Sequence, residues 1–332
     1  MSGYAAHRVA TAVAQLLIIT LVAYLLFFVI ADLTGASPAQ RVAGKGATPE
    51  RVREIAHIMG VDRPWYEQYA TFLSRLARGN LGYSFQRRQP VADVVFPAAA
   101  VTASLVLGAA VLWVLIAIVV GLVGALHPRS LADRVLTIGV QVSIAAPVFW
   151  VAPMLAYLLA YQPTQGTLLG IPLGRSVSWL PIQGYVTLTS DPFEWARHLI
   201  LPWIALAIGF AALYARFVRA FVLEQLSEEY VKTARAKGAR ESRIIRRHIG
   251  RLVAPAIVVL LGLDVGVALG GALFVEQVFG LPGLGYIGLS SIQNLDYGLT
   301  VGVITFAALV AVAANAAADL IQAMLDPRVR AN

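Results

Sequence analysis

The sequence contains no cysteine among its 332 residues. This absence excludes disulfides, thiol nucleophiles, thiolate zinc sites and iron–sulfur clusters, so only histidine and carboxylate side chains remain as metal ligands. Charged residues are also scarce: they make up 13% of the chain, whereas soluble proteins contain about 25%. Hydrophobic residue types reach 58%. This composition excludes a water-soluble fold and indicates a membrane protein.

Long apolar runs predict the transmembrane helices, because a helix needs about 20 mostly apolar residues to cross the hydrocarbon core of a bilayer. The first run is too long and too poor in basic residues at its start for a signal peptide, so we expect it to be retained. The predicted fold is all-α and polytopic, with six spans at about 9–30, 101–126, 135–161, 199–215, 252–275 and 299–325.

The distribution of Lys and Arg predicts the orientation, since short cytoplasmic loops are enriched in both. The connection after the third predicted span has few basic residues and the one after the fifth has none. Both termini are therefore expected in the cytoplasm. The segment 32–100 is expected outside, because long loops cross a membrane largely regardless of charge. The cytoplasmic segment 216–251 carries the densest basic set, namely Arg216, Arg219, Lys232, Arg235, Lys237, Arg240, Arg243, Arg246, Arg247 and Arg251.

The two outer segments differ in their expected structure. Helix start and stop residues in 32–100 predict one helix from Thr48 and Pro49 to Gly60, and a second from Asp62 and Pro64 to Gly79. One face of the second helix is apolar and is expected to pack on the bundle or on the membrane surface; it contains Trp65, Tyr69, Phe72 and Leu76. The segment 162–197 contains too many Pro and Gly residues for a regular element.

A short amphipathic helix is predicted inside the cytoplasmic segment. Ser227 is a suitable N-cap, Glu228 and Glu229 suit the first turn, and Gly238 suits the position after the last turn. A helix of about ten residues is only marginally stable alone, so its apolar face needs a partner. Three interpretations stand: positive-inside charge at the membrane surface, docking of a cytoplasmic partner, and nucleic-acid binding, which is disfavoured because no recognition fold is present.

Several motifs in order resemble one known family. The stretch Glu229-Tyr-Val-Lys-Thr-Ala-Arg-Ala-Lys-Gly238 resembles the cytoplasmic loop of the peptide- and nickel-type permeases of ABC importers. The resemblance continues nearly along the whole chain, through Val61-Asp-Arg-Pro64, Gly79-Asn-Leu-Gly82, Gln89-Pro-Val-Ala-Asp93, Val275-Glu-Gln-Val-Phe279, Pro282-Gly-Leu-Gly285 and Leu325-Asp-Pro-Arg-Val-Arg330. Gly35-Ala-Ser-Pro38 departs from the family's usual Gly-Asp-Pro.

The resemblance implies a non-catalytic permease subunit in the inner membrane of a prokaryote. It implies a homologous second permease, two cytoplasmic ATP-binding subunits that bind ATP and magnesium, an outer solute-binding protein and lipid contact, with no cofactor and no nucleic acid. The chain lacks a phosphate-binding loop of its own. Short or longer peptides, nickel chelates and glutathione-like molecules all fit as cargo. The implied ATPase-coupling residues are Glu229, Tyr230, Lys232, Ala234, Arg235 and Gly238; the competing interpretation of Glu229 and Arg235 is a solvated ion pair.

Polar residues at membrane depth are further candidates, because a charge there is costly. Asp264 is predicted either to line the pathway and attract a peptide ammonium group or to serve packing among glycines. Gln293 and Asn294 are weaker gate candidates. Asn315 and Asp319 are expected to hydrogen-bond between helices rather than contact substrate.

Two other functions compete with the importer. An ion-coupled secondary transporter would also use intramembrane acids, but the halves show no convincing repeat. A membrane enzyme is disfavoured, because the histidines are scattered and no paired-carboxylate or Ser/His/Asp site is visible.

Overall fold

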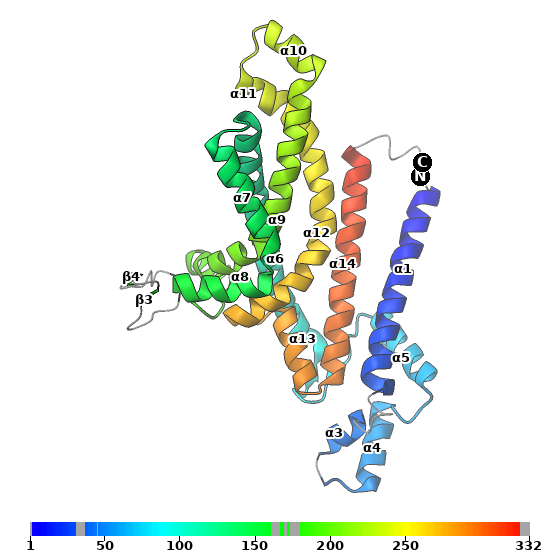
Figure 1. Ribbon diagram of the computed structural model, residues 1–332. Helices are drawn as coiled ribbons and strands as arrows, with labels where there is room; N and C mark the ends of the chain where they lie inside the picture. The colour runs from blue at the N-terminus through cyan, green and yellow to red at the C-terminus, as the bar shows by residue number, and fades with distance from the viewer. Residues whose placement is uncertain are drawn as a thin grey trace. The chain divides into compact units, whose positions relative to one another are not determined.

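The computed structural model describes residues 2–30, 37–44, 46–160, 167–168, 171–172 and 180–325. Most of the described chain is helical (Figure 1). The chain divides into two compact units. The first unit comprises Met1–Val101 and Pro282–Ala316, and the second comprises Thr102–Leu281 and Ala317–Asn332. The helices α6 and α14 run from one unit into the other.

The first unit combines membrane-length helices with shorter helices and a pair of short strands. Its strands β1 and β2 form an antiparallel pair with Tyr83 opposite Pro90 and Ser84 opposite Gln89. A buried cluster that includes Val91, Leu284 and Leu299 joins the start of α6 to α13 and α14. Its elements are α1 (Ser2–Tyr24), η1 (Leu25–Ile30), α3 (Pro38–Ala43), α4 (Pro49–Met59), α5 (Trp65–Ala77), β1 (Tyr83–Ser84), β2 (Gln89–Pro90), the start of α6 (Val91–Leu126), α13 (Leu284–Gln293) and most of α14 (Tyr297–Leu325).

Both predicted helices of the segment 32–100 are present. The Thr48 side chain accepts a hydrogen bond from the Arg51 N–H at 3.4 Å, and Gly60 ends α4 in the left-handed conformation with φ 70°. The second helix starts later than expected, since Pro64 occupies the N-cap. The carboxylate of Asp62 instead lies 2.8 Å from His57 Nδ1. That hydrogen bond holds the pKa of Asp62 below its usual value.

The apolar face of α5 packs on α1. The Tyr69 hydroxyl donates to the Leu17 carbonyl oxygen at 3.0 Å, and the Tyr24 ring lies 5.7 Å from Tyr69 and 5.9 Å from Phe72. Trp65 departs from this pattern, because it is 47% exposed. Packing on the bundle is therefore correct for Tyr69 and Phe72 and does not account for Trp65.

The second unit contains the rest of α6 and the central helices. Two details correct the prediction of an irregular segment at 162–197: β3 and β4 form a short antiparallel pair, and α9 already begins at Pro192, where Asp191 caps it. Within this unit α9 packs against α7, α8 and α12. Its elements are α7 (Leu131–Ala145), α8 (Val148–Leu155), η2 (Ala156–Ala160), β3 (Thr167–Leu168), β4 (Ile171–Pro172), α9 (Pro192–Ser227), α10 (Glu229–Ala236), α11 (Glu241–Arg243), η3 (Ile244–Ile249) and α12 (Gly250–Phe279).

The prediction of one continuous helix over 135–161 is wrong. The chain bends by 108° between α7 and α8. The break falls at Ala146, which is extended (φ −89°, ψ 111°), because the ring of Pro147 disfavours a helical conformation in the residue before it. Among the described residues, five helices are long and apolar enough to cross a membrane, and the bent pair gives a sixth if it counts as one span.

Close approach between α6 and α9 depends on Gly108. A Cβ atom on Gly108 would lie 2.2 Å from Cε2 of Trp203, whose indole N–H donates to the Ser104 carbonyl oxygen at 3.0 Å. By contrast, a Cβ on Gly139 in α7 would have no atom within 4 Å. Gly108 is therefore required by packing, whereas Gly139 is not.

We expect Gly108→Ala to destabilise the protein by about 1–3 kcal/mol, because the indole must move and give up its hydrogen bond. Gly139→Ala should be neutral or stabilising by up to about 1 kcal/mol, since alanine favours the helix. Thermal unfolding of the purified full chain in detergent measures both changes. Equal shifts in the two variants would contradict the packing argument.

Candidate functional site

The most exposed functional candidate is α10, which lies at the end of the second unit where α9 and α12 approach each other (Figure 1). Glu228, not Ser227, occupies its N-cap. The α9 helix continues through Ser227, whose hydroxyl donates back to the Glu224 carbonyl oxygen at 2.6 Å. The predicted cap is therefore wrong, and α10 has 8 residues, not about ten.

Two side chains attach α10 to its own chain. Val231 is fully buried. The Tyr230 hydroxyl donates to Gln225 Oε1 at 3.0 Å, and its ring centroid lies 6.3 Å from that of His248 in η3. Burial and the nearby Glu228 carboxylate raise the pKa of Tyr230, so its hydroxyl remains a proton donor at neutral pH. Part of the apolar face of α10 is thus covered without any partner protein.

Gly238 ends α10 as predicted. Its φ is +77°, and the Ala239 N–H donates to the Ala234 carbonyl oxygen at 3.0 Å. The Gly238 N–H donates to the Arg235 carbonyl oxygen at 2.9 Å. These two bonds form a Schellman motif, which requires a left-handed residue after the helix and turns the chain toward α11.

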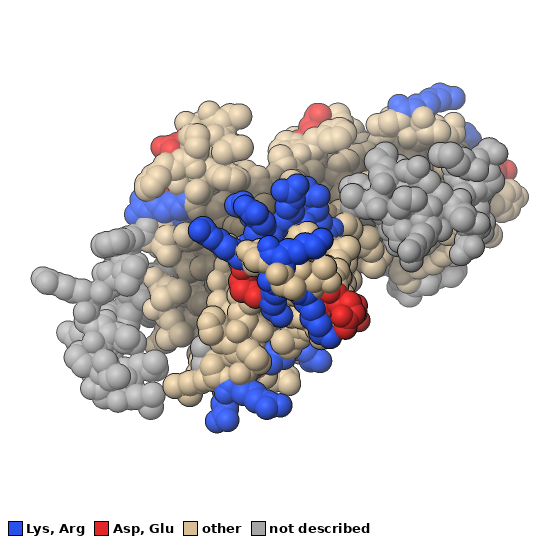
Figure 2. All heavy atoms as spheres, turned by 90° about the horizontal axis from the view of Figure 1, so that it is seen from above, with Lys and Arg blue, Asp and Glu red and all other residues tan. Residues whose placement is uncertain are grey.

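The charged residues of α10 form ion pairs in which both partners are largely exposed. Lys232 Nζ lies 2.7 Å from the Glu229 carboxylate, and Arg235 Nε lies 2.6 Å from that of Glu241. The second pair crosses the Gly238 turn and raises the pKa of Arg235. Within this chain, Glu229 and Arg235 therefore each belong to a solvated ion pair. Their partners are Lys232 and Glu241, and the two residues do not pair with each other. Figure 2 shows Lys and Arg gathered on the face of the molecule that carries α10.

An ion pair that the sequence did not reveal joins α9 to the start of α7. Arg219 on α9 donates from Nε to Asp133 Oδ1 at 2.8 Å and from Nη2 to Oδ2 at 2.9 Å. Asp133 is only 6% exposed and also accepts from the Arg129 N–H. Ser130 caps α7 by accepting from the Asp133 N–H at 3.1 Å. The pattern Ser-x-x-Asp was visible in the sequence as a helix start, but its partner was not.

Asp264 lies on α12 and is held by α9. The Tyr214 hydroxyl donates to Asp264 Oδ2 at 2.6 Å, and the Asp264 side chain is half-buried. Tyr214 itself is buried and lies beside Trp113. The carboxylate therefore has a fixed partner that the sequence analysis did not identify.

The remaining candidates lie on α13 and α14. Gln293 and Asn294 end α13 in the first unit and are exposed; Asn294 Nδ2 donates to the Ser290 carbonyl oxygen at 2.8 Å, which gives it a capping role. Their gate role stays a prediction. Asn315 is exposed on α14. Asp319 is in the same helix, but its side chain lies outside the described set.

Together, the fold and this site define a polytopic α-helical membrane protein that presents a short, charged, well-anchored helix on one unit. The sequence pattern of the binding-protein-dependent transport system inner membrane component family matches residues 114–331, and the N-terminal pattern of the same kind of component matches residues 1–106. The chain belongs to this family. It is thus a non-catalytic, multi-pass permease subunit of an ABC transport system in the inner membrane.

Similar proteins cover the whole chain. A protein of Brucella abortus, named as a peptide transport system permease, is 32% identical over 330 residues, with 99% of each chain covered. A peptide permease protein of Brucella ovis is 30% identical with the same coverage. A dipeptide transport system permease protein of Alkalihalophilus pseudofirmus is 29% identical over 99% of this chain and all of its own. None of these matches supports an ion-coupled secondary transporter.

Proposed function

We propose that this chain is one of two homologous permease subunits of an ATP-driven peptide importer, with α10 as the coupling helix. Two cytoplasmic ATP-binding subunits, which hold ATP and magnesium, and an outer solute-binding protein complete the transporter. The names of the similar proteins support the peptide cargo. The observation that carries the coupling role is the exposed charged helix α10, which is anchored through Val231 and Tyr230.

The coupling follows from rigid connections. Closure of the ATP-binding subunits on ATP would move α10, and the short links at Glu228 and Gly238 would pass that movement to α9 and α12. Because α9 and α12 pack along each other, the movement changes how they line the pathway. Glu229, Lys232 and Arg235 would exchange their exposed intrachain pairs for contacts with the ATP-binding subunit, at small cost because exposed pairs are weak.

This proposal requires α10 in the cytoplasm and the segment 32–100 outside. The chain has no cysteine, so a single introduced thiol reports its own location. Ala236→Cys on α10 and Ser74→Cys on α5 both replace exposed residues. In intact cells, we expect a membrane-impermeant maleimide to label Ser74→Cys and to leave Ala236→Cys unlabelled until the membrane is opened. Labelling of Ala236→Cys in intact cells would eliminate the coupling role.

Asp264 is proposed to attract the ammonium group of a peptide in the pathway, with Tyr214 holding the carboxylate in place. We expect Asp264→Asn to raise the KM for peptides with a free N-terminus by about tenfold, the loss of one charge-assisted hydrogen bond. N-acetylated peptides provide the control, because they have no ammonium group. Uptake assays in proteoliposomes measure both; an equal change for the two peptide types would assign Asp264 to packing.

A further inference from the structure

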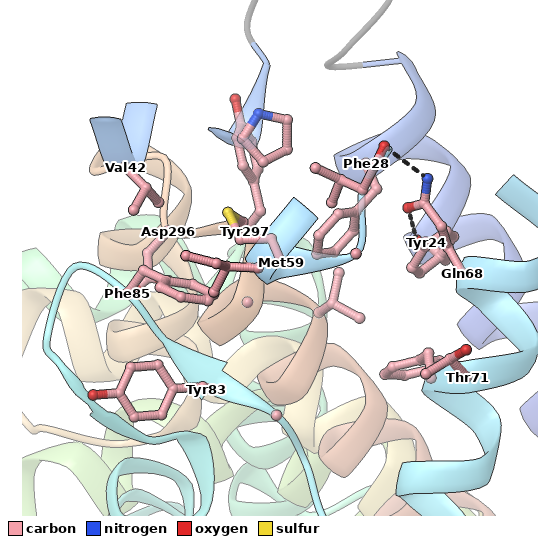
Figure 3. Close-up of a pocket in the computed structure, with 18 of the residues that line it drawn as sticks. Tyr24, Phe28, Val42, Met59, Gln68, Thr71, Tyr83, Phe85, Asp296 and Tyr297 are labelled. Carbon is pink, nitrogen blue, oxygen red and sulfur yellow. Dashed lines mark hydrogen bonds between the residues drawn. The ribbon is translucent and has the colours of Figure 1, made fainter. Parts of the chain in front are cut away.

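The first unit contains a cavity of about 370 Å³ that the proposed transport mechanism does not use. Its lining comes from α1 and η1, α3, α4, α5, β1 with the residues around it, and the start of α14 (Figure 3). One wall is aromatic. The stacked rings of Tyr24 and Phe28 have centroids 4.8 Å apart, the Phe72 centroid lies 5.9 Å from that of Tyr24, and the Tyr297 centroid lies 6.4 Å from that of Phe28. We call it the α1–α14 cavity.

The polar lining of the α1–α14 cavity favours an anion. Its carboxylate and two of its amide oxygens are already occupied: Asp296 accepts from the Ser84 hydroxyl and the Leu299 N–H, Gln68 accepts from the Tyr24 hydroxyl, and Asn80 accepts from the Gly82 N–H.

The cationic groups of the cavity are not occupied in the same way. Arg41, Arg63 and Arg75 contribute to the lining, and within the described part of the chain their guanidinium groups form no ion pair. Guanidinium groups are suited to phosphate, which they bind with strong, charge-assisted hydrogen bonds. The cavity therefore suits an occupant whose phosphate oxygens accept hydrogen bonds from these guanidinium groups and that needs no acceptor from the protein.

The position of the cavity indicates that its occupant carries apolar chains as well as an anionic group. It lies where α1, a membrane-length helix, ends, and aromatic rings are enriched at that depth of a bilayer. On the face of α1 that carries Tyr24, the helix exposes a row of apolar side chains to its surroundings: Val9, Val13 and Leu17. A ligand with an anionic head and apolar chains can fill both places. A soluble phosphate compound or an acidic peptide would leave the apolar row unused.

We propose that the α1–α14 cavity binds the headgroup of an anionic phospholipid, with its phosphate at Arg41 and Arg75 and its acyl chains along α1. Such a lipid tethers α3, α4 and α5 to the membrane surface beside α1. The site lies wholly in the first unit, so it is independent of the coupling helix.

The test is native mass spectrometry of the full-length chain with added palmitoyl-oleoyl phosphatidylglycerol. We expect phosphatidylglycerol to bind at least about tenfold more tightly than phosphatidylcholine, whose headgroup carries no net charge. The double variant Arg41→Gln/Arg75→Gln should lose that preference. Arg78→Gln is the matched control, because Arg78 is the C-cap of α5, is exposed as Arg41 and Arg75 are, and does not line the cavity. The proposal is overturned if the double variant keeps the wild-type preference for phosphatidylglycerol, or if Arg78→Gln loses that preference to the same extent as the double variant.

A photoactivatable phosphatidylglycerol gives a second measurement on the unmodified chain, which does not depend on whether a variant folds. We expect crosslinks on peptides that contain Phe28 or Phe72. Crosslinks confined to other segments overturn the site. Competition by glycerol phosphate at equal concentration would assign the cavity to a soluble phosphate compound, and competition by an acidic peptide would assign it to a protein segment. Either result overturns the lipid assignment.

Discussion

Gly238→Val in the complete transporter is expected to lower substrate-stimulated ATPase activity at least about tenfold, with membrane insertion intact. Gly238 has φ +77°, and a left-handed conformation costs a residue with a side chain about 1–2 kcal/mol, more for a β-branched one. A Cβ there would meet no atom within 4 Å, so the effect comes from the backbone and not from a clash. Loss of the Schellman motif would let α10 move without α12.

Gly238→Asn distinguishes this cause from any other. Asparagine accepts the left-handed conformation far better than valine, so Gly238→Asn should retain most of the coupling. The measurement is ATPase activity of the reconstituted transporter with and without loaded solute-binding protein. If both variants lose coupling equally, side-chain bulk at the docking surface is responsible; if neither loses it, Gly238 has no role in coupling.

Asp133→Ala is expected to lower the melting temperature of the protein by at least about 4 °C and to reduce transport strongly. The substitution removes both hydrogen bonds to Arg219 and leaves that guanidinium half-buried without its partner. It also frees the Arg129 N–H. Because this pair fastens the start of α7 to α9, its loss loosens the base from which α10 projects.

A double-mutant cycle tests the pair directly. Arg219→Ala should cost much less in the Asp133→Ala background than in the wild type, since the shared interaction is already gone. Arg134→Ala serves as the control, because Arg134 is the neighbouring charge and is exposed. Additive losses in the double variant would show that Asp133 and Arg219 act separately.

Local rules predicted the elements whose ends depend on one or two neighbouring residues. Thr48 and Gly60 bound α4 as expected, and Gly238 ends α10. Apolar runs located the long helices, since the bilayer requirement acts on composition and length alone. The same rules failed at Ser227, which is the last residue of α9 while Glu228 takes the N-cap of α10. They also failed at Pro147, because the apolar run 135–161 gave no sign of the bend at Ala146.

Contacts between distant residues were beyond those rules. Nothing in the sequence distinguished Arg219 from the other basic residues of segment 216–251, because its partner Asp133 precedes it by 86 positions. Tyr214 likewise gained significance only when α9 and α12 placed it beside Asp264. The α1–α14 cavity depends on six separate segments that only folding brings together.

The sequence by itself determined that this chain is a membrane protein, because a content of 58% hydrophobic residues excludes a water-soluble fold. It also determined that a basic, amphipathic helix lies between two of the spans. Only the tertiary structure decided which charges of that region are paired, where the third apolar run bends and which side chains surround a cavity. The physical reason is range: the length of an apolar run and helix capping depend on near neighbours along the chain, whereas ion pairs and cavities require helices to meet.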